Sequence, residues 1–254
     1  MGRIRVDLGG KVALVTGAGK GLGRAASLAL AESGASVAAV SRTASDLESL
    51  RREILALGAE CFTRTCDVRN VEDVYRMVEE VHAWKGRIDI LVNSAGINIQ
   101  AEALEVTEEQ WDAVLDTNLK GAFFCCQAVA KKMIPQREGK IVNITSTMSM
   151  VGFYRRAAYC SSKGGLSQLT KVLAIEWAPY NIKVNCVAPT FIRTPLTEPM
   201  FKDQDFYQEV VRRIPLGKVG LPEDVTGAIL YLVSDSADFV TGSSILVDGG
   251  WVAW

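Results

Sequence analysis

A tyrosine and a lysine are the two side chains in this sequence best suited to acid/base chemistry. Tyr159 and Lys163 lie four residues apart in a segment with a helical pattern, so both project from the same helix face. A free phenol has a pKa of about 10 and is a poor base at neutral pH. A neighbouring ammonium stabilises the phenolate. The pair therefore predicts a phenol that gives and takes a proton at a reacting oxygen.

A glycine-rich turn near the start of the chain predicts a dinucleotide site. Its pattern, T-G-x-x-x-G-x-G over Thr16–Gly23, lies between a β-forming apolar run and an apolar helical segment. Glycines allow a tight turn and let backbone amides approach a pyrophosphate, and the helix N-terminus adds the positive end of its dipole. The contacts predicted in this turn are Gly17, Gly19, Lys20, Gly21, Leu22 and Gly23.

With these motifs, the chain resembles the short-chain dehydrogenase/reductase family over essentially its whole length. The matching residues include Asp67-Val68, Asn93-Ser94-Ala95-Gly96, Asn118, Ser146, Tyr159 with Lys163, Asn185-Cys186-Val187-Ala188-Pro189 and Val247-Asp248-Gly249-Gly250. The resemblance implies cofactor contacts at Asp67, Val68, Asn93, Ala95, Gly96, Tyr159, Lys163, Pro189, Ile192 and Thr194. It departs from the family at Ser94, where a second Asn is usual, and at Thr190, where Gly is usual.

The resemblance also implies four catalytic residues: Asn118, Ser146, Tyr159 and Lys163. Ser146, at the family's usual separation from Tyr159, would orient the substrate oxygen. Lys163 would also hold the nicotinamide ribose. Asn118 would help to hold a water that links Lys163 to solvent; the alternative is hydrogen bonding within its own helix. The expected reaction moves a hydride between the nicotinamide and a carbonyl or alcohol carbon, with Tyr159 as acid or base.

The end of the second predicted strand favours NADP(H) as the cofactor. An acidic residue there would bind the adenosine ribose hydroxyls and repel a 2′-phosphate, whereas this chain has Ser41-Arg42. The Arg42 guanidinium offers a planar fork of donors to a phosphate, with Lys20 helping from the glycine turn. The alternative is that Arg42 is a solvated surface residue and NAD binds.

The substrate is less well defined by the sequence. Arg156 precedes Tyr159 by three residues and would pair with a carboxylate or phosphate, although the sequence alone favours an exposed or inter-subunit arginine there. Met148, Phe191 and Phe201 would form an apolar wall, with core packing as the alternative for each.

Three functions therefore remain open. Part of the chain resembles gluconate 5-dehydrogenase-like members of the family, which indicates a ketose, polyol or sugar acid as substrate. Other parts resemble 3-oxoacyl-carrier-protein reductases equally well. A non-catalytic, dinucleotide-binding regulatory protein is the third candidate, and the complete set of four catalytic residues argues against it.

Alternating strand and helix patterns predict the frame that carries these residues. Unbroken apolar runs predict strands covered on both faces at Val12–Thr16, Ser36–Val40, Cys61–Thr65, Ile88–Val92, Lys140–Thr145, Ile182–Val187 and Ser244–Val247. Helical patterns lie between them at Leu22–Ser33, Ala44–Leu57, Val71–Trp84, Glu108–Met133 and Ala157–Ala178. The sequence thus predicts one α/β domain over residues 1–254, of the doubly wound Rossmann type, with a seven-stranded parallel sheet.

A proline-rich stretch interrupts this alternation at about residues 190–222, with a short helical pattern at Asp203–Arg213. A long insertion near the carboxyl ends of the strands predicts a substrate lid, and a purely structural excursion is the alternative. We expect a homotetramer in which the long helices Glu108–Met133 and Ala157–Ala178 pack between subunits. The apolar tail Trp251–Trp254 is expected at a subunit contact or near a neighbour's active site.

Charge and cysteine content narrow the class of protein further. The 28 basic and 29 acidic side chains nearly cancel, which gives no support for a nucleic-acid or anionic-membrane surface. No apolar run approaches the roughly 20 residues of a membrane span, and Val12–Val15 reads as a core strand and not as part of a signal peptide. The six cysteines form no C-x-x-C pair and His82 is the only histidine, so we expect no metal site. Free thiols favour a cytoplasmic location.

Overall fold

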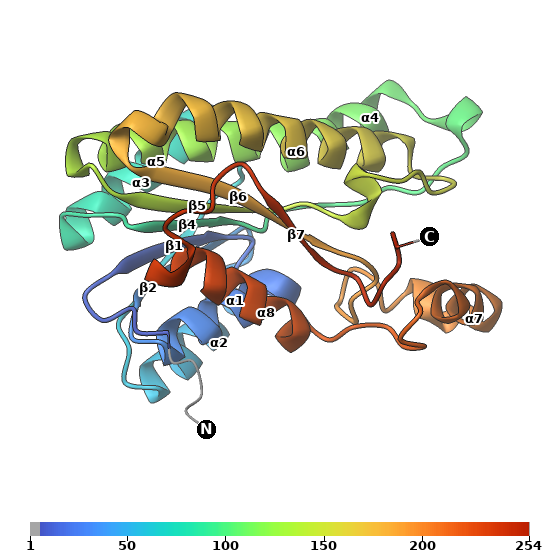
Figure 1. Cartoon of the computed structure of the whole chain (residues 1–254), viewed down its shortest axis with the longest axis horizontal. Helices are drawn as coiled ribbons and strands as arrows, with labels where there is room; N and C mark the ends of the chain where they lie inside the picture. Colours follow the sequence, from blue (N-terminus) through green and yellow to red (C-terminus); the bar gives the residue numbers. More distant parts are fainter. Residues whose placement is uncertain (1–5, 254) are drawn as a thin grey trace.

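The computed structural model describes residues 6–253, which form a single α/β domain around a parallel sheet (Figure 1). The sheet has seven strands in the order β3-β2-β1-β4-β5-β6-β7. The predicted doubly wound Rossmann-type fold is therefore confirmed. The strands are β1 Val12–Thr16, β2 Ser36–Ser41, β3 Cys61–Thr65, β4 Ile90–Asn93, β5 Gly139–Ile144, β6 Ile182–Pro189 and β7 Ser244–Val247.

The central strands are buried on both faces, which explains their unbroken apolar runs. Every residue of β1, β4 and β5 is buried. Successive β1 side chains point to opposite layers, so Ala13 and Val15 enter one core cluster and Leu14 enters the other. β3 and β7 form the two edges of the sheet and are only partly buried.

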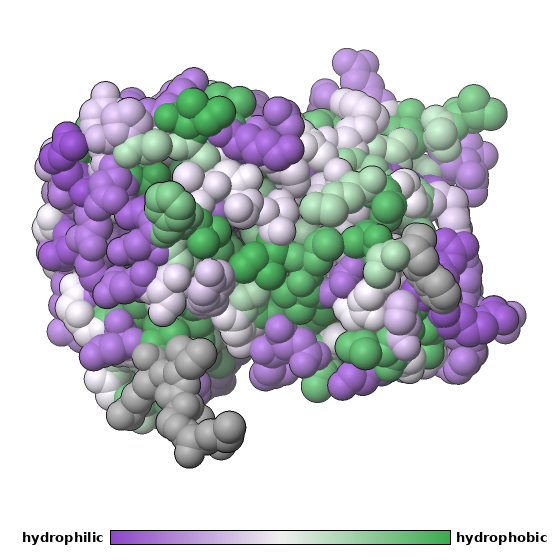
Figure 2. Space-filling view, in the orientation of Figure 1, coloured by the Kyte–Doolittle hydropathy of each residue, from purple (hydrophilic) through white to green (hydrophobic). Residues whose placement is uncertain are grey.

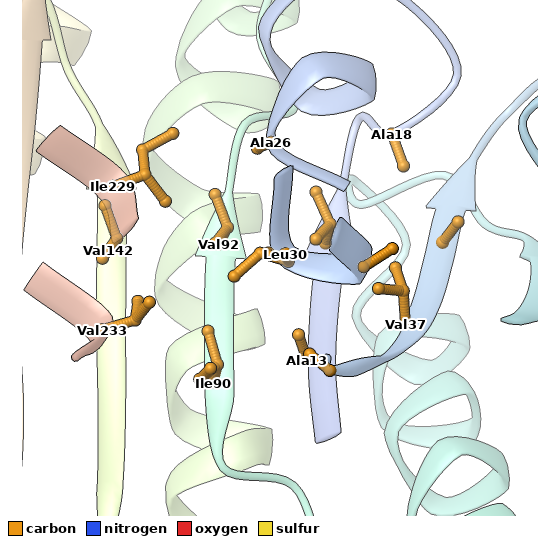
Figure 3. Close-up of a cluster of buried hydrophobic side chains, with 14 of the residues drawn as sticks. Ala13, Ala18, Ala26, Leu30, Val37, Ile90, Val92, Val142, Ile229 and Val233 are labelled. Atoms are coloured by element: carbon orange, nitrogen blue, oxygen red, sulfur yellow. The ribbon is translucent and has the colours of Figure 1, made fainter. Parts of the chain in front are cut away.

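Helices cover both faces of the sheet (Figure 1). One face carries α1 Gly21–Glu32, α2 Ala44–Ala56 and α8 Pro222–Val233, and the other carries α3 Val71–Lys85, α5 Gly121–Gln136 and α6 Ala157–Trp177. In Figure 3, Leu30 of α1 and Ile229 and Val233 of α8 pack over side chains of the central strands. No helix among residues 6–253 has the length and apolar character that a membrane crossing requires.

The predicted long helix Glu108–Met133 is divided in the structure. It consists of α4 Glu108–Leu115, a π-helical turn at Asp116–Lys120 and then α5. A π turn holds one more residue per hydrogen-bonded loop, so it rotates the following side chains about the helix axis. Asn118 lies in this turn.

Helix α8 was not among the helices that the sequence predicted, because Pro222 was counted with the prolines of the preceding excursion. Pro222 occupies the first helical turn, where a missing N–H costs nothing. The Asp224 carboxylate accepts a hydrogen bond from the Leu221 amide at 2.7 Å and satisfies the start of the helix.

The excursion between β6 and α8 folds over the carboxyl ends of the strands. It contains a short 3-10 turn at Met200–Lys202 and helix α7 Gln204–Arg213. Asp203, predicted inside α7, instead caps it by accepting from the Asp205 and Phe206 amides. The excursion encloses a third apolar cluster, built from Met148, Phe191, Phe201, Val210, Ile214, Val219 and Trp251.

Candidate active site

The glycine turn after β1 has a shape that only glycine permits at two of its positions. Gly17 has a φ of 67°, and a Cβ there would lie 2.7 Å from the backbone nitrogen of Ala95. A Cβ on Gly23 would collide with the carbonyl of Gly17. The first turn of α1 holds no acidic residue, and no side chain caps its N-terminus. The turn therefore leaves backbone amides free for an anionic group, which is the geometry that a pyrophosphate needs.

A cavity of about 470 Å³ runs from this turn across the carboxyl ends of the strands. Of the predicted cofactor contacts, the structure places all but two in its wall: Gly17, Gly19, Lys20, Gly21, Leu22, Ser41, Arg42, Asp67, Val68, Ala95, Gly96, Tyr159, Lys163, Pro189, Ile192 and Thr194. Thr43, Asp46, Ile97 and Leu196 also line the cavity, and sequence reasoning missed them because no motif includes them.

The two exceptions are Gly23 and Asn93. Gly23 packs against the backbone of the glycine turn. Asn93 is 3 % exposed, and its amide donates to Asn143 Oδ1 at 2.9 Å. The same amide donates to the Ala122 carbonyl of α5 at 3.4 Å, so Asn93 joins β4 to β5 under α5 and does not line the cavity.

The end of β2 brings together the side chains that would meet an adenosine ribose. Arg42 is exposed, lines the cavity and forms no ion pair with residues 6–253. Lys20 lies 3.2 Å from the Asp46 carboxylate, so its ammonium already has a partner. Asp67 is likewise paired with Arg69 at 2.6 Å, and this hydrogen bond holds the pKa of its carboxyl below the usual value. Arg42 is thus the unpaired cation at this end of the cavity.

Tyr159, Lys163 and Ser146 meet at the opposite end. Lys163 is 5 % exposed, donates to the Ile144 carbonyl at 2.7 Å and lies 5.7 Å from the Tyr159 ring centre. Burial lowers the pKa of Lys163 to about 8. Burial raises the pKa of Tyr159, while hydrogen bonding with Ser146 acts in the opposite direction. The three side chains therefore lie together in the cavity wall.

Asn118 lies behind Lys163, outside the cavity wall. Its side chain is completely buried, accepts from the Ile97 amide at 2.8 Å and donates to the Ile97 carbonyl at 2.9 Å and to Ser162 at 3.1 Å. These partners belong to other segments, so bonding within its own helix is the wrong interpretation. A Cβ on Gly96 would lie 3.3 Å from Asn118 Oδ1 and 3.6 Å from Lys163 Nζ, which places both side chains around that glycine.

The predicted substrate residues lie beside the cavity, under the excursion. Met148 and Phe191 are buried in the third apolar cluster, together with Phe201. Arg156 is 2 % exposed, so the sequence preference for an exposed or inter-subunit arginine is wrong. The physical reason is the excursion, whose Met200 covers the Arg156 guanidinium at 3.3 Å. Trp251 is also buried within its own chain, against Phe153 and Phe191, and Trp254 lies outside the described residues.

Comparison with known proteins gives consistent matches over almost the whole chain. The family described as Enoyl-(Acyl carrier protein) reductase matches residues 17–252. The 2-dehydro-3-deoxy-D-gluconate 5-dehydrogenase of Dickeya dadantii is 40% identical over 248 residues, which is 97% of each chain. The 3-oxoacyl-(acyl-carrier-protein) reductase of Thermotoga maritima is 42% identical over 96% of this chain and 99% of that one.

Among solved structures, a gluconate 5-dehydrogenase from Burkholderia cenocepacia in complex with NADP and tartrate superposes with a TM-score of 0.95. It is 35% identical, and the match covers 98% of each chain.

The buried Lys163 makes the stability of the cofactor-free protein depend on pH. Its pKa falls from 10.5 in the unfolded chain to about 8 in the folded one, so between these values the unfolded state binds the extra proton. The free energy of unfolding should therefore rise with pH in this window. Urea unfolding of the wild type and Lys163→Met between pH 8 and about 9.5, below the range of free phenols, measures the effect.

We expect the free energy of unfolding of the wild type to increase relative to that of Lys163→Met as the pH rises. Lys171→Met, on the exposed side of the same helix, should retain the wild-type profile. A difference between the wild type and Lys163→Met that stays constant or shrinks with pH would contradict a buried Lys163 ammonium.

Proposed function

This chain belongs to the short-chain dehydrogenase/reductase family, and on that premise we propose that it is an NADP(H)-dependent oxidoreductase. It would move a hydride between the nicotinamide and the carbinol or carbonyl carbon of a sugar acid or related polyol. The observation that carries this proposal is the meeting of Ser146, Tyr159 and Lys163 in the wall of the same cavity as the glycine turn. The substrate class is that of the Dickeya and Burkholderia relatives.

Four side chains of this chain have separate roles in the proposed reaction. The cofactor, when bound, supplies the carbon that donates or accepts the hydride. In reduction, Tyr159 gives its phenolic proton to the substrate oxygen, and Ser146 donates a hydrogen bond that orients that oxygen. Lys163 stabilises the phenolate that remains. Asn118 positions Ile97 and Ser162 behind Lys163, where the water of the proton relay would lie.

Replacing the phenolic hydroxyl tests this assignment. Tyr159→Phe removes the proton donor and keeps the ring that packs in the third apolar cluster. We expect kcat to fall about 10²- to 10⁴-fold, as for loss of a general acid, with NADPH affinity changed less than about threefold. NADPH fluorescence measures binding, and its absorbance measures turnover on a panel of ketoses, sugar acids and acetoacetyl thioesters. Turnover near the wild-type rate would overturn the assignment.

The preference for NADP(H) rests on Arg42. Its unpaired guanidinium lines the cavity beside Ser41, and no acidic residue of β2 is there to bind a ribose 2′-hydroxyl. The Burkholderia structure with NADP bound supports the same cofactor.

Reversing the charge at this position should reverse the preference. Arg42→Asp should lower kcat/KM with NADP at least tenfold and raise kcat/KM with NAD, because a carboxylate repels the 2′-phosphate and accepts from the free ribose. Arg52→Asp, at an exposed arginine of α2 outside the cavity wall, is the control for a charge change of the same size. A wild type that prefers NAD would contradict the proposal.

The Thermotoga relative supports a second candidate, reduction of a 3-oxoacyl thioester on an acyl carrier protein. The two substrates differ in polarity and charge. A non-catalytic regulatory protein remains the alternative of a different class, and turnover of any substrate in the panel would exclude it.

We also propose that the excursion at about residues 190–222 acts as a substrate lid on the single domain. Pro195, Leu196 and Thr197 of this segment line the cavity. Helix α7 is fastened to the body by an exposed contact, in which Tyr154 donates to the Glu209 carboxylate at 2.8 Å.

A cytoplasmic location agrees with the six cysteines, all of which are free.

We propose a homotetramer because large apolar side chains are exposed on the α4 and α6 layer and near the β7 edge. Trp111 of α4 and Val172 and Ile175 of α6 are exposed on one layer. Phe239 and Leu246 are exposed near the β7 edge, where Figure 2 shows hydrophobic side chains gathered at the surface. The first of these surfaces lies on the two long helical segments that the sequence predicted at subunit contacts.

Light scattering on the eluted protein measures the assembly. We expect four times the 27.5 kDa mass of the chain. Ile175→Glu should reduce that mass, because it buries a charge at the proposed contact. Leu104→Glu, at a fully exposed leucine outside both surfaces, should leave it unchanged. A monomeric wild type would contradict the proposal.

A further inference from the structure

Arg156 is a buried cation for which the chain supplies few hydrogen-bond acceptors. Its side chain is 2 % exposed. Nη1 donates to the Arg155 carbonyl at 3.2 Å, Nη2 approaches the weakly accepting sulfur of Met200 at 3.3 Å, and Nε has no partner. Five N–H groups thus meet one carbonyl oxygen and one thioether.

No carboxylate compensates this charge. Among residues 6–253, no Asp or Glu lies within 4 Å of the Arg156 guanidinium. The nearest charged neighbour in sequence, Arg155, has the same sign and works with burial to lower the pKa of Arg156. The face of the Phe153 ring is 5.9 Å from the guanidinium carbon, at the outer limit of a cation–π contact. A buried charge without a partner is costly, so an anion from outside the chain would stabilise it.

The position of Arg156 links it to the reacting group. It lies directly before α6 and three residues before Tyr159, so both side chains leave the start of the helix on the same side. Burial raises the pKa of the Tyr159 phenol, and the charge of Arg156 acts in the opposite direction. Met200, which covers the guanidinium, belongs to the excursion, and neighbouring residues Leu196 and Thr197 line the cavity. An anion on Arg156 would therefore lie under the excursion, at the edge of the cavity whose wall holds Tyr159.

We propose that Arg156 binds the carboxylate of the substrate through the planar fork of its guanidinium and thereby selects sugar acids over their uncharged counterparts. This inference rests on the proposed function and assigns the substrate class to one side chain. The acyl chain of a 3-oxoacyl thioester would leave the same charge buried against methylene groups, so Arg156 also argues against that second candidate.

Two substrates with the same carbon chain separate charge recognition from shape. D-gluconate and D-glucitol differ in having a carboxylate or a CH2OH group at C1. Each is assayed by NADP reduction with the wild type, Arg156→Gln, Arg156→Lys and the control Arg155→Gln. Arg155 is exposed beside Arg156, so the control removes the same charge without entering the buried region.

We expect Arg156→Gln to lower kcat/KM for gluconate about 100-fold, mainly through KM, as for loss of a charge-assisted bidentate pair. The loss on glucitol should be at least tenfold smaller. Arg156→Lys should recover part of the gluconate activity, because it restores the charge without the fork. Arg155→Gln should behave as the wild type on both substrates. Equal losses on gluconate and glucitol in Arg156→Gln would overturn the inference while leaving the oxidoreductase proposal intact.

A binding measurement keeps the inference testable if the proposed substrate class is wrong. Calorimetry of gluconate binding to the NADP-loaded proteins requires no turnover, and NADPH fluorescence shows that each variant retains a folded cofactor site. If the wild type binds gluconate without oxidising it, the proposed substrate class is refuted. Loss of that binding in Arg156→Gln would still support an anion site at Arg156. No gluconate binding by the wild type, or equal binding by Arg156→Gln, would overturn the inference.

Discussion

The burial of the Lys163 ammonium is the constraint on which the candidate site depends. An ammonium that is 5 % exposed needs acceptors, and the protein supplies the carbonyl of Ile144, the last residue of β5. Lys163 also lines the cavity, with its Nζ 5.7 Å from the centre of the Tyr159 ring. The charge is thus held at the end of a rigid strand by a helix that also carries Tyr159. A site built on such elements keeps its geometry better than one built on loops.

The residues around Lys163 leave space for its side chain and satisfy one another's polar groups. Gly96 gives Lys163 and Asn118 the space that a side chain would occupy. The π turn at Asp116–Lys120 contains Asn118, whose amide bonds to Ile97 and Ser162. Asn93 and Asn143 tie β4 to β5 beneath the cavity. These buried polar side chains are all satisfied by hydrogen bonds, which allows them to be rigid without the cost of an unpaired polar group.

The sequence predicted the sheet and the glycine turn from local patterns, and the rest of the predicted cavity wall from the family resemblance. Unbroken apolar runs identified the strands, and the Tyr159–Lys163 spacing identified the paired side chains. The π turn escaped prediction because its residues continue the helical pattern, and α8 did so because Pro222 reads equally as a break or a first turn. The burial of Arg156 depends on Met200, which is 44 positions away in the chain, and no local pattern reports such a contact. Asn93 was assigned to the cofactor by resemblance, whereas its side chain faces α5 and bonds to Asn143, the residue opposite it on β5.

Transfer of an isotopic label tests the central claim, that the cavity places a substrate carbon against the nicotinamide. NADPH deuterated at C4 would be incubated with the keto form of the sugar acid in ordinary water, and the product examined by mass spectrometry and NMR. We expect one of the two C4 epimers to transfer one deuterium to the newly formed carbinol carbon, with the hydroxyl proton derived from solvent through Tyr159. If neither C4 epimer of the labelled cofactor gives deuterium at that carbon, direct hydride transfer from the nicotinamide is contradicted.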